Sequence, residues 1–143
     1  METAKRQNLL HKLHAEIGRL AAIINAPAEL LPQRAPSPNG TWITLDWYRG
    51  NDGDDPDGWY LSLVRNEDAQ DWVLSEVLAD HPDYLLYVLF DEITEKLAKD
   101  VVGRIGYSDQ RAAWFSAQEA LLGQLSDDWR ARTAQRHAQM LNV

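Results

Sequence analysis

One stretch, residues 82–102, constrains the fold of this chain more than any other. It reads PDYLLYVLFDEITEKLAKDVV and contains no glycine and, after its first residue, no proline. Proline is favoured at the first helical position, and Asp83 suits the positive end of the helix dipole. The apolar residues recur at helical spacing and draw one stripe of Leu86, Leu89, Phe90, Ile93, Leu97 and Val101. We therefore expect a long amphipathic helix whose apolar face requires a partner surface.

The composition is that of one globular domain, residues 1–143. This length is sufficient for a self-contained core, and the hydrophobic fraction of 45% and charged fraction of 25% are ordinary. The absence of cysteine excludes disulfides and thiolate sites. No signal peptide is apparent, and no apolar run is long enough to cross a bilayer. We therefore expect a cytoplasmic protein.

Acidic residues are concentrated in the middle of the chain. Between Asp46 and Glu95 there are 14 acidic residues against two basic ones, Arg49 and Arg65, which gives a local charge of −12. Residues 1–34 and 96–143 each carry +2. A field of this sign repels nucleic acid and anionic membranes and accelerates encounter with basic partners. The alternative, a solvated acidic surface that only aids solubility, is the commoner case for acidic domains.

The N-terminal segment predicts a helix within residues 1–25, followed by an irregular connector over residues 26–40. The connector holds four of the six prolines and ends in Asn39-Gly40, so we expect one short turn at residues 28–31 at most. The predicted apolar side of the helix consists of Leu9, Leu10, Leu13, Ile17, Leu20, Ile23 and Ile24. His11 and His14 stand three residues apart on it, but the sequence indicates no third ligand, so we predict no metal site there.

Over residues 41–78 the hydrophobic period changes from 3.6 to 2, which indicates β-structure. TWITLDWYR, GWYLSLVR and DWVLSEVL are joined by polar turns and predict a three-stranded antiparallel meander, although the last segment is also compatible with helix. In the first strand we expect Ile43, Leu45 and Trp47 to share the buried face. The helix from Pro82 follows next in the chain and is expected to cover one face of the sheet.

Beyond Gly106 a second long helix is predicted, from the N-cap candidate Ser108 to about Met140. Ser126-Asp127-Asp128-Trp129 resembles a new N-cap, so we expect the helix to kink or restart there. Its predicted buried stripe is Trp114, Ala117, Leu121 and Leu125, with Phe115, Gln118 and Leu122 beside it. The predicted fold class is α+β: an N-terminal helix, a three-stranded antiparallel meander, and two long C-terminal helices over residues 82–141 packed on the sheet.

No catalytic constellation stands out. The chain lacks GxSxG and HExxH motifs, a phosphate-binding glycine loop and a cysteine nucleophile. The loop from Asn51 to Gly58 invites comparison with a calcium loop. An EF-hand, however, would require an oxygen ligand in place of Pro56, glycine in place of Asp57 and glutamate in place of Leu63. We therefore predict no enzyme, no catalytic residue, no metal site and no cofactor.

Two stretches, YLLYVLFDEIT and DQRAAWFSAQEALLGQLSDDW, resemble the signature of the immunity-protein family numbered 63 of bacterial polymorphic toxin systems. The hairpin YLSLVRNEDAQDWVLSEV is similar in length and position to the family's strand–turn–strand, and the resemblance covers half to two-thirds of the chain. The matching residues are Leu85, Leu86, Tyr87, Phe90, Asp91, Glu92, Ile93 and Thr94, then Asp109, Arg111, Phe115, Gln118, Leu121, Leu122, Gly123, Leu125 and Trp129.

This resemblance implies an inhibitor that binds a cognate toxin domain in the producing cell and protects that cell. Among the matching residues, Phe90, Phe115, Leu122 and Trp129 are expected in the core. Asp109, Arg111 and Gln118 are expected as buried or boundary polar residues. In such families the toxin-facing surface is usually the variable part, so the motif itself transfers no contact residue to this chain.

The charge distribution therefore supplies the contact prediction. Many toxin domains of such systems are nucleases with basic clefts, which an acidic surface would occlude by mimicking phosphate. We predict a cognate toxin domain as partner, with a basic nuclease as the class that the charge favours, and no direct nucleic-acid or membrane contact. The oligomeric state stays open. The predicted partner-binding residues are Tyr48, Asp52, Asp54, Asp55, Asp57, Trp59, Glu67, Asp68, Asp91 and Glu95.

Two other functions stay open. One is a non-catalytic adaptor or effector chaperone that delivers a toxin without neutralising it; an immunity gene, in contrast, should lie directly downstream of a toxin-domain reading frame. The other is a small metal-dependent hydrolase. Metal in the purified protein, together with loss of activity on mutation of His11, His14 or the Asp-rich loop, would support that reading.

Overall fold

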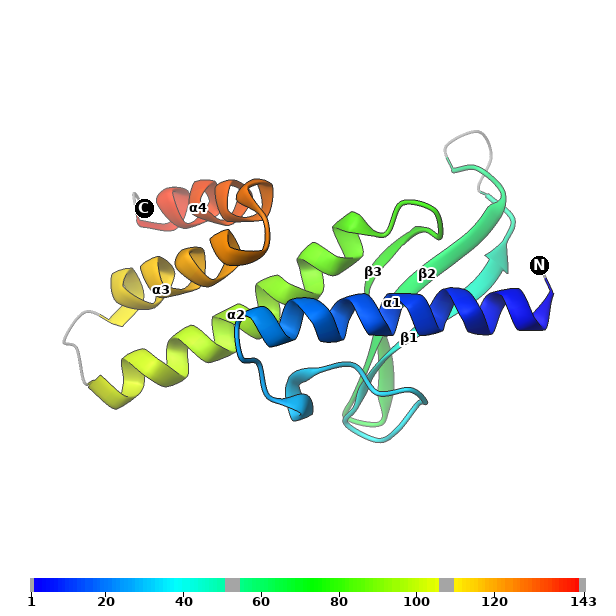
Figure 1. Ribbon diagram of the computed structural model, residues 1–143, viewed down its shortest axis with the longest axis horizontal. Helices are drawn as coiled ribbons and strands as arrows, with labels where there is room; N and C mark the ends of the chain where they lie inside the picture. Colours follow the sequence, from blue (N-terminus) through cyan, green and yellow to red (C-terminus); the bar gives the residue numbers. More distant parts are fainter. Residues whose placement is uncertain (1, 51–54, 106–109, 142–143) are drawn as a thin grey trace. The chain divides into compact units, whose positions relative to one another are not determined.

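The computed structural model describes residues 2–50, 55–105 and 110–141. The architecture is α+β, as the sequence predicts, with an N-terminal helix, an antiparallel sheet and then helices (Figure 1). The predicted short turn in the connector is confirmed as a 3-10 turn. In chain order the elements are α1 (Thr3–Ile23), η1 (Ala28–Leu30), β1 (Thr41–Tyr48), β2 (Gly58–Glu67), β3 (Gln70–Leu78), α2 (Asp83–Ile105), α3 (Gln110–Leu125) and α4 (Asp127–Leu141).

The chain forms two compact units. The sheet unit comprises residues 1–18 and 31–88, and the helical unit comprises residues 19–30 and 89–143. Two of the boundaries between them fall inside α1 and inside α2, and the third follows η1. No helix in the described part of the chain combines the length and the apolar character needed to span a membrane.

The sheet has the order β1-β2-β3 with both pairs antiparallel, and its register places Leu61 of β2 between Leu45 and Val77. Residues 60–64 of this central strand are all buried, because β2 has a neighbour on each edge. In β1, Ile43 and Leu45 are buried as expected. The prediction is wrong for Trp47, which is 56% exposed, because it lies near the end of the edge strand β1, edge-on to Trp59.

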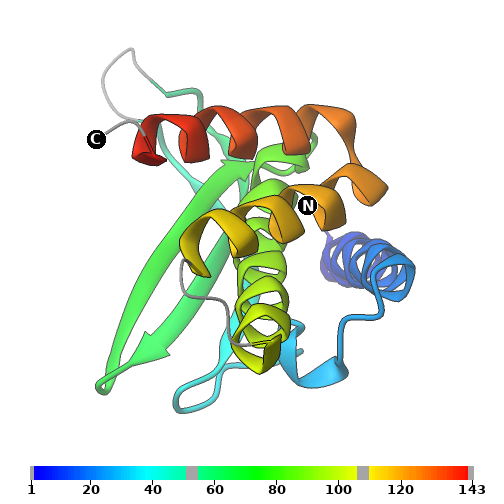
Figure 2. The ribbon, with the colours of Figure 1, turned by 90° about the vertical axis from the view of Figure 1, so that its left-hand side faces the viewer.

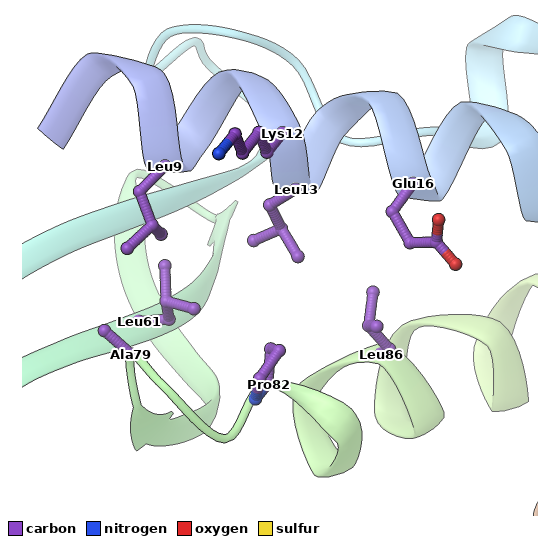
Figure 3. Close-up of a pocket in the computed structure, with 8 residues that line it drawn as sticks. All are labelled: Leu9, Lys12, Leu13, Glu16, Leu61, Ala79, Pro82 and Leu86. Atoms are coloured by element: carbon purple, nitrogen blue, oxygen red, sulfur yellow. The ribbon is translucent and has the colours of Figure 1, made fainter. Parts of the chain in front are cut away.

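The first half of α1 packs on the face of the sheet that carries Leu61. Arg6 fixes its start: one guanidinium N–H donates to the main-chain oxygen of Leu45 at 2.7 Å, and the same nitrogen lies 3.6 Å from the Asp46 carboxylate. The guanidinium also lies 5.3 Å from the Trp59 ring centroid, which is cation–π distance. Figure 3 shows a pocket of about 240 Å³ below the helix, lined by Leu9, Lys12, Leu13, Glu16, Leu61, Ala79, Pro82 and Leu86.

In the helical unit, α3 and α4 run side by side as an antiparallel hairpin (Figure 2). The hydroxyl of Ser126 accepts a hydrogen bond from the main-chain N–H of Trp129 at 3.2 Å, which confirms the predicted N-cap and restart. Of the two predicted possibilities, a kink or a restart, the structure shows the restart, with α3 and α4 as separate helices. Trp129 stacks on Phe90 of α2 with ring centroids 6.0 Å apart.

Two predicted helical stripes need correction. In α3 the buried residues are Phe115, Gln118 and Leu122, one position away from the predicted stripe of half-buried Trp114, Ala117, Leu121 and Leu125. In α2 the predicted Val101 is 50% exposed and Leu97 is half-buried, whereas Ala98 and Val102 are buried. Both shifts have one cause. The buried faces are those on which Thr94 of α2 and Gln118 of α3 meet. A prediction that counts only apolar residues does not include such a polar contact.

On α1 the predicted apolar side is correct at Leu13, Ile17, Leu20 and Ile24, which are buried. The prediction is wrong at Ile23, which is exposed as the last helical residue.

Candidate functional site

Acidic residues gather around two tyrosines at the end of the sheet where β1 leads into β2. The register pairs Tyr48 with Gly58, so Tyr48 and Tyr60 lie on the same face, with ring centroids 6.1 Å apart. Glu76 of β3 pairs with Ser62 and therefore joins this face. We call this set the acidic–aromatic patch; its members are Asp46, Tyr48, Asp55, Asp57, Tyr60 and Glu76.

Short-range contacts hold Gly50, Pro56 and Asp57 beside this patch. The Tyr60 hydroxyl donates to the main-chain oxygen of Pro56 at 2.6 Å, and the main-chain N–H of Gly50 donates to the Asp57 carboxylate at 2.6 Å. A Cβ at Gly50 would overlap the main-chain oxygen of Asp55, so the loop requires glycine there. The result is a shaped hollow of about 210 Å³, lined by Tyr48, Arg49, Gly50, Asp55, Tyr60 and Glu76.

The electrostatics of the patch can be followed through its tyrosines. Burial, and then the carboxylates of Asp46 and Glu76, raise the pKa of Tyr48 above its usual 10.0. For Tyr60 the pKa is raised by burial first and then by Asp55, Glu76 and Asp57. Both hydroxyls therefore stay neutral donors at physiological pH within a field of four carboxylates. Such a surface favours a cationic partner group.

The structure brings together only part of the predicted contact set. Tyr48, Asp55 and Asp57 belong to the patch, whereas Asp52 and Asp54 lie outside the described residues. Trp59 lies at the same end of the sheet but on the opposite face, edge-on to Trp47 at 6.0 Å and beneath Arg6.

Glu67 and Asp68 are exposed at the opposite end of the sheet. Glu67 ends β2 and Asp68 begins the turn to β3, whereas the patch is built around the start of β2. The ten residues of β2 span about 30 Å, so one small contact does not include both ends of the strand.

Asp91 and Glu95 belong to the helical unit, and each carboxylate already has a partner there. The Asp91 carboxylate accepts hydrogen bonds from the Thr133 hydroxyl at 3.1 Å, Arg136 at 2.8 Å and the Gln118 amide at 3.0 Å. Glu95 pairs with Lys99 at 2.7 Å. A partner-binding role for these two acids stays a prediction, but Asp91 has a structural function that the sequence did not suggest.

The surroundings of Asp91 show where the residues that carry the family resemblance lie in the structure. Gln118 is fully buried and also donates to the main-chain oxygen of Asp91 at 2.7 Å, which confirms it as a buried polar tie. Arg111 is exposed in the first turn of α3, so the prediction of a buried or boundary position is wrong, and Asp109 lies outside the described residues. The predicted core residues Phe90, Phe115, Leu122 and Trp129 are all buried.

Sequence reasoning missed Asp46, Tyr60 and Glu76 as members of the patch. The signal for the first two was present, because Asp46 and Tyr48 have the same parity along β1, and Tyr60 is the second residue after Gly58. Glu76 could not be placed, since a register shift beside Leu63 and Val64 interrupts the β2–β3 pairing.

A metal centre finds no support in the described part of the chain, where no three His, Cys, Asp or Glu side chains converge in a way that could hold an ion. Burial, then the charge of Arg34 and of His11, lowers the pKa of His14 below its usual 6.5.

Comparison with known proteins shows that part of the chain matches one family. Residues 71–139 match the family model described as Immunity protein 63. The match begins in β3 and continues through most of α4, so it includes Glu76, Asp91 and Gln118 but not β1 or β2. Neither a curated protein nor a solved structure matches the chain.

Proposed function

The chain belongs to the Immunity protein 63 family across residues 71–139, and on this premise we propose that it binds and neutralises a cognate toxin domain in the cytoplasm of the producing cell. The observation that supports the binding mode is the acidic–aromatic patch, in which carboxylates from strands β1 and β3 and from the loop before β2 surround Tyr48 and Tyr60. The proposal assigns no reaction to this chain; inhibition results from binding alone.

In the proposed mode the patch faces a basic cleft of the toxin, where a nuclease would hold nucleic-acid phosphates. The carboxylates of Asp55, Asp57 and Glu76 accelerate encounter by electrostatic steering, whereas the Asp46 carboxylate lies 3.6 Å from Arg6. Tyr48 is exposed and supplies rigid contact area and a neutral hydroxyl, as aromatic residues do at binding hot spots, whereas Tyr60 is buried and donates its hydroxyl to Pro56. Lysine or arginine of the toxin would then enter the hollow between Tyr48, Asp55, Tyr60 and Glu76.

Charge reversal tests this proposal. We expect the double variant Asp55→Lys, Glu76→Lys to bind the toxin domain encoded next to this gene about 100-fold more weakly than the unmodified protein. It should also lose most of the salt dependence of binding and fail to restore growth when co-expressed with that toxin. Both residues are exposed, so the fold should tolerate the changes.

The matched control carries the same change in net charge away from the patch. Glu2→Lys, Glu29→Lys alters two exposed acids outside the sheet and should leave affinity within about threefold of the unmodified protein, because only general charge is lost. Equal affinity and equal salt slopes for the patch variant and this control would refute the patch as the contact surface.

A further inference from the structure

The two outer edges of the sheet differ. The edge of β1 is partly covered: the main-chain N–H of Gln33 donates to the Thr41 oxygen at 2.7 Å, and Arg6 donates to the Leu45 oxygen at 2.7 Å. Along β3, within residues 2–50, 55–105 and 110–141, no further strand pairs with the outer edge. Unpaired main-chain groups on an edge form a template for another strand.

The first half of β3 is unusually exposed for an apolar strand. Residues 70–73 are all exposed, and Trp72 and Val73 keep 50% and 60% of their surface accessible. Because side chains alternate along a strand, these two residues project from opposite faces. Natural edges are normally protected by lysine or proline, yet β3 contains neither; its charged residues are Asp71 and Glu76.

We infer that the edge of β3 from Gln70 to Val73 accepts an extended segment of the toxin as a fourth strand. The inference rests on the proposed function and names a second part of the same interface. Main-chain hydrogen bonds would supply affinity, while Trp72 and Val73 would cover the added strand from the two faces. The incoming segment would alternate apolar with lysine or arginine side chains, the latter opposite Asp71.

Charge complementarity favours the toxin over a second copy of this chain. β3 carries two acidic residues and no basic one, and the adjoining turn adds Glu67 and Asp68. Pairing two β3 edges would bring these like charges together, which disfavours a strand pair, whereas a basic strand relieves the same field.

The register identifies which main-chain groups face outward. Glu67 pairs with Gln70 across a two-residue turn, and both turn residues, Asp68 and Ala69, have positive φ. In such hairpins the pair that closes the turn exchanges hydrogen bonds with itself. Alternation from Gln70 therefore directs the N–H groups of Asp71 and Val73 away from β2.

A proline tests this geometry with little risk to the fold. Val73→Pro removes one outward N–H, and proline is tolerated on edge strands where that N–H faces solvent. We expect about tenfold weaker binding to the toxin domain encoded next to this gene, the effect of one lost main-chain hydrogen bond. The matched control Val73→Thr keeps the N–H and a β-branched side chain, and should bind within about threefold of the unmodified protein. Thermal unfolding of both variants checks the fold.

Hydrogen exchange of the unmodified protein separates this inference from the proposed function, and does not depend on any variant. In the toxin complex we expect the outward-facing amides of Asp71 and Val73 to exchange at least tenfold more slowly than in the free protein. If the toxin binds and these amides exchange at the free rate, the inference is overturned while the proposed function stands. Absence of binding overturns both. A dimer that Val73→Pro dissolves, detected by sedimentation, would assign the edge to a second copy instead.

Discussion

The helical unit and the sheet unit use carboxylates in opposite ways. In the helical unit, Asp91 accepts hydrogen bonds from the Thr133 hydroxyl, Arg136 and the Gln118 amide, so its charge is balanced by groups of the protein itself. In the sheet unit, Asp55 and Glu76 are exposed beside Tyr48 and Tyr60. The same chemical group therefore serves as an internal support in one region and remains available to a partner in the other.

The two units also differ in backbone strain. The positive φ of 54° at Asn25, in the helical unit, suits asparagine. The β2–β3 turn of the sheet unit places Ala69 at φ 60°, a conformation that alanine rarely adopts. Strain, an open edge and exposed acids thus coincide in the sheet unit. In the proposed binding mode, the sheet unit supplies the contact surface and the helical unit serves as scaffold.

The largest effect is expected from Asp91→Ala. Gln118 and Thr133 are buried and would lose an acceptor together with Arg136, so the free energy of unfolding should fall by about 3 kcal/mol. Urea denaturation followed by tryptophan fluorescence measures the change. The control Glu95→Ala removes only an exposed pair with Lys99 and should cost less than about 0.5 kcal/mol. If the two variants lose similar amounts of unfolding free energy, Asp91 stabilises the fold no more than an acid on the surface does.

The next effect has the opposite sign. Ala69→Gly should raise the free energy of unfolding by about 1 kcal/mol, because glycine adopts positive φ without steric cost. Ala120→Gly, at an exposed position inside α3, should lower it by about 1 kcal/mol. If both variants are destabilised, the turn stores no strain, and the difference between the units rests on charge alone.

Titration of the tyrosines gives a smaller, spectroscopic test. Because the folded protein raises the pKa of Tyr48 and Tyr60 above 10.0, the unfolded chain loses these protons first as pH rises. The associated stability is complete below pH 10 and declines above it. Absorbance at 295 nm should show delayed ionisation, and Asp55→Asn with Glu76→Gln should advance it. The pair Glu2→Gln, Glu29→Gln should leave the curve unchanged; an equal shift would mean that the patch carboxylates do not act locally.

The smallest effect concerns the histidines. In the helical unit His137 has Glu119 beside it at 2.9 Å, whereas His14 in the sheet unit has Arg34 and His11 in its surroundings. Since the pKa of His14 is lowered in the folded protein, the unfolded chain binds the proton first as pH falls through 6.5, and stability declines below that value. His14→Gln should flatten this part of the pH–stability curve, while His11→Gln should retain most of it because burial is the main cause. If the pH–stability curve of His14→Gln keeps the slope of the unmodified protein, protonation of His14 does not cause the loss of stability at low pH.

Local patterns in the sequence predicted much of the fold. The changes of hydrophobic period located the helices and strands, and the N-cap at Ser126 located the restart of the last helix. The spacing of Phe90, Phe115, Leu122 and Trp129 supported both their burial and the family resemblance. Hydrophobic period, capping residues and motif spacing are properties of the order of residues along the chain, so the sequence alone contains them.

The tertiary structure decided which acids act together. The sequence placed Tyr48, Asp55 and Asp57 among ten candidates, but only strand register could add Glu76 to their face and separate Glu67 and Asp68 from them. Likewise only helix packing could commit Asp91 to Gln118, Thr133 and Arg136, residues 27 to 45 positions away in the chain. Local periodicity specifies where a segment is apolar. The partner of each polar group lies far away in the sequence and is determined only when the segments pack against one another.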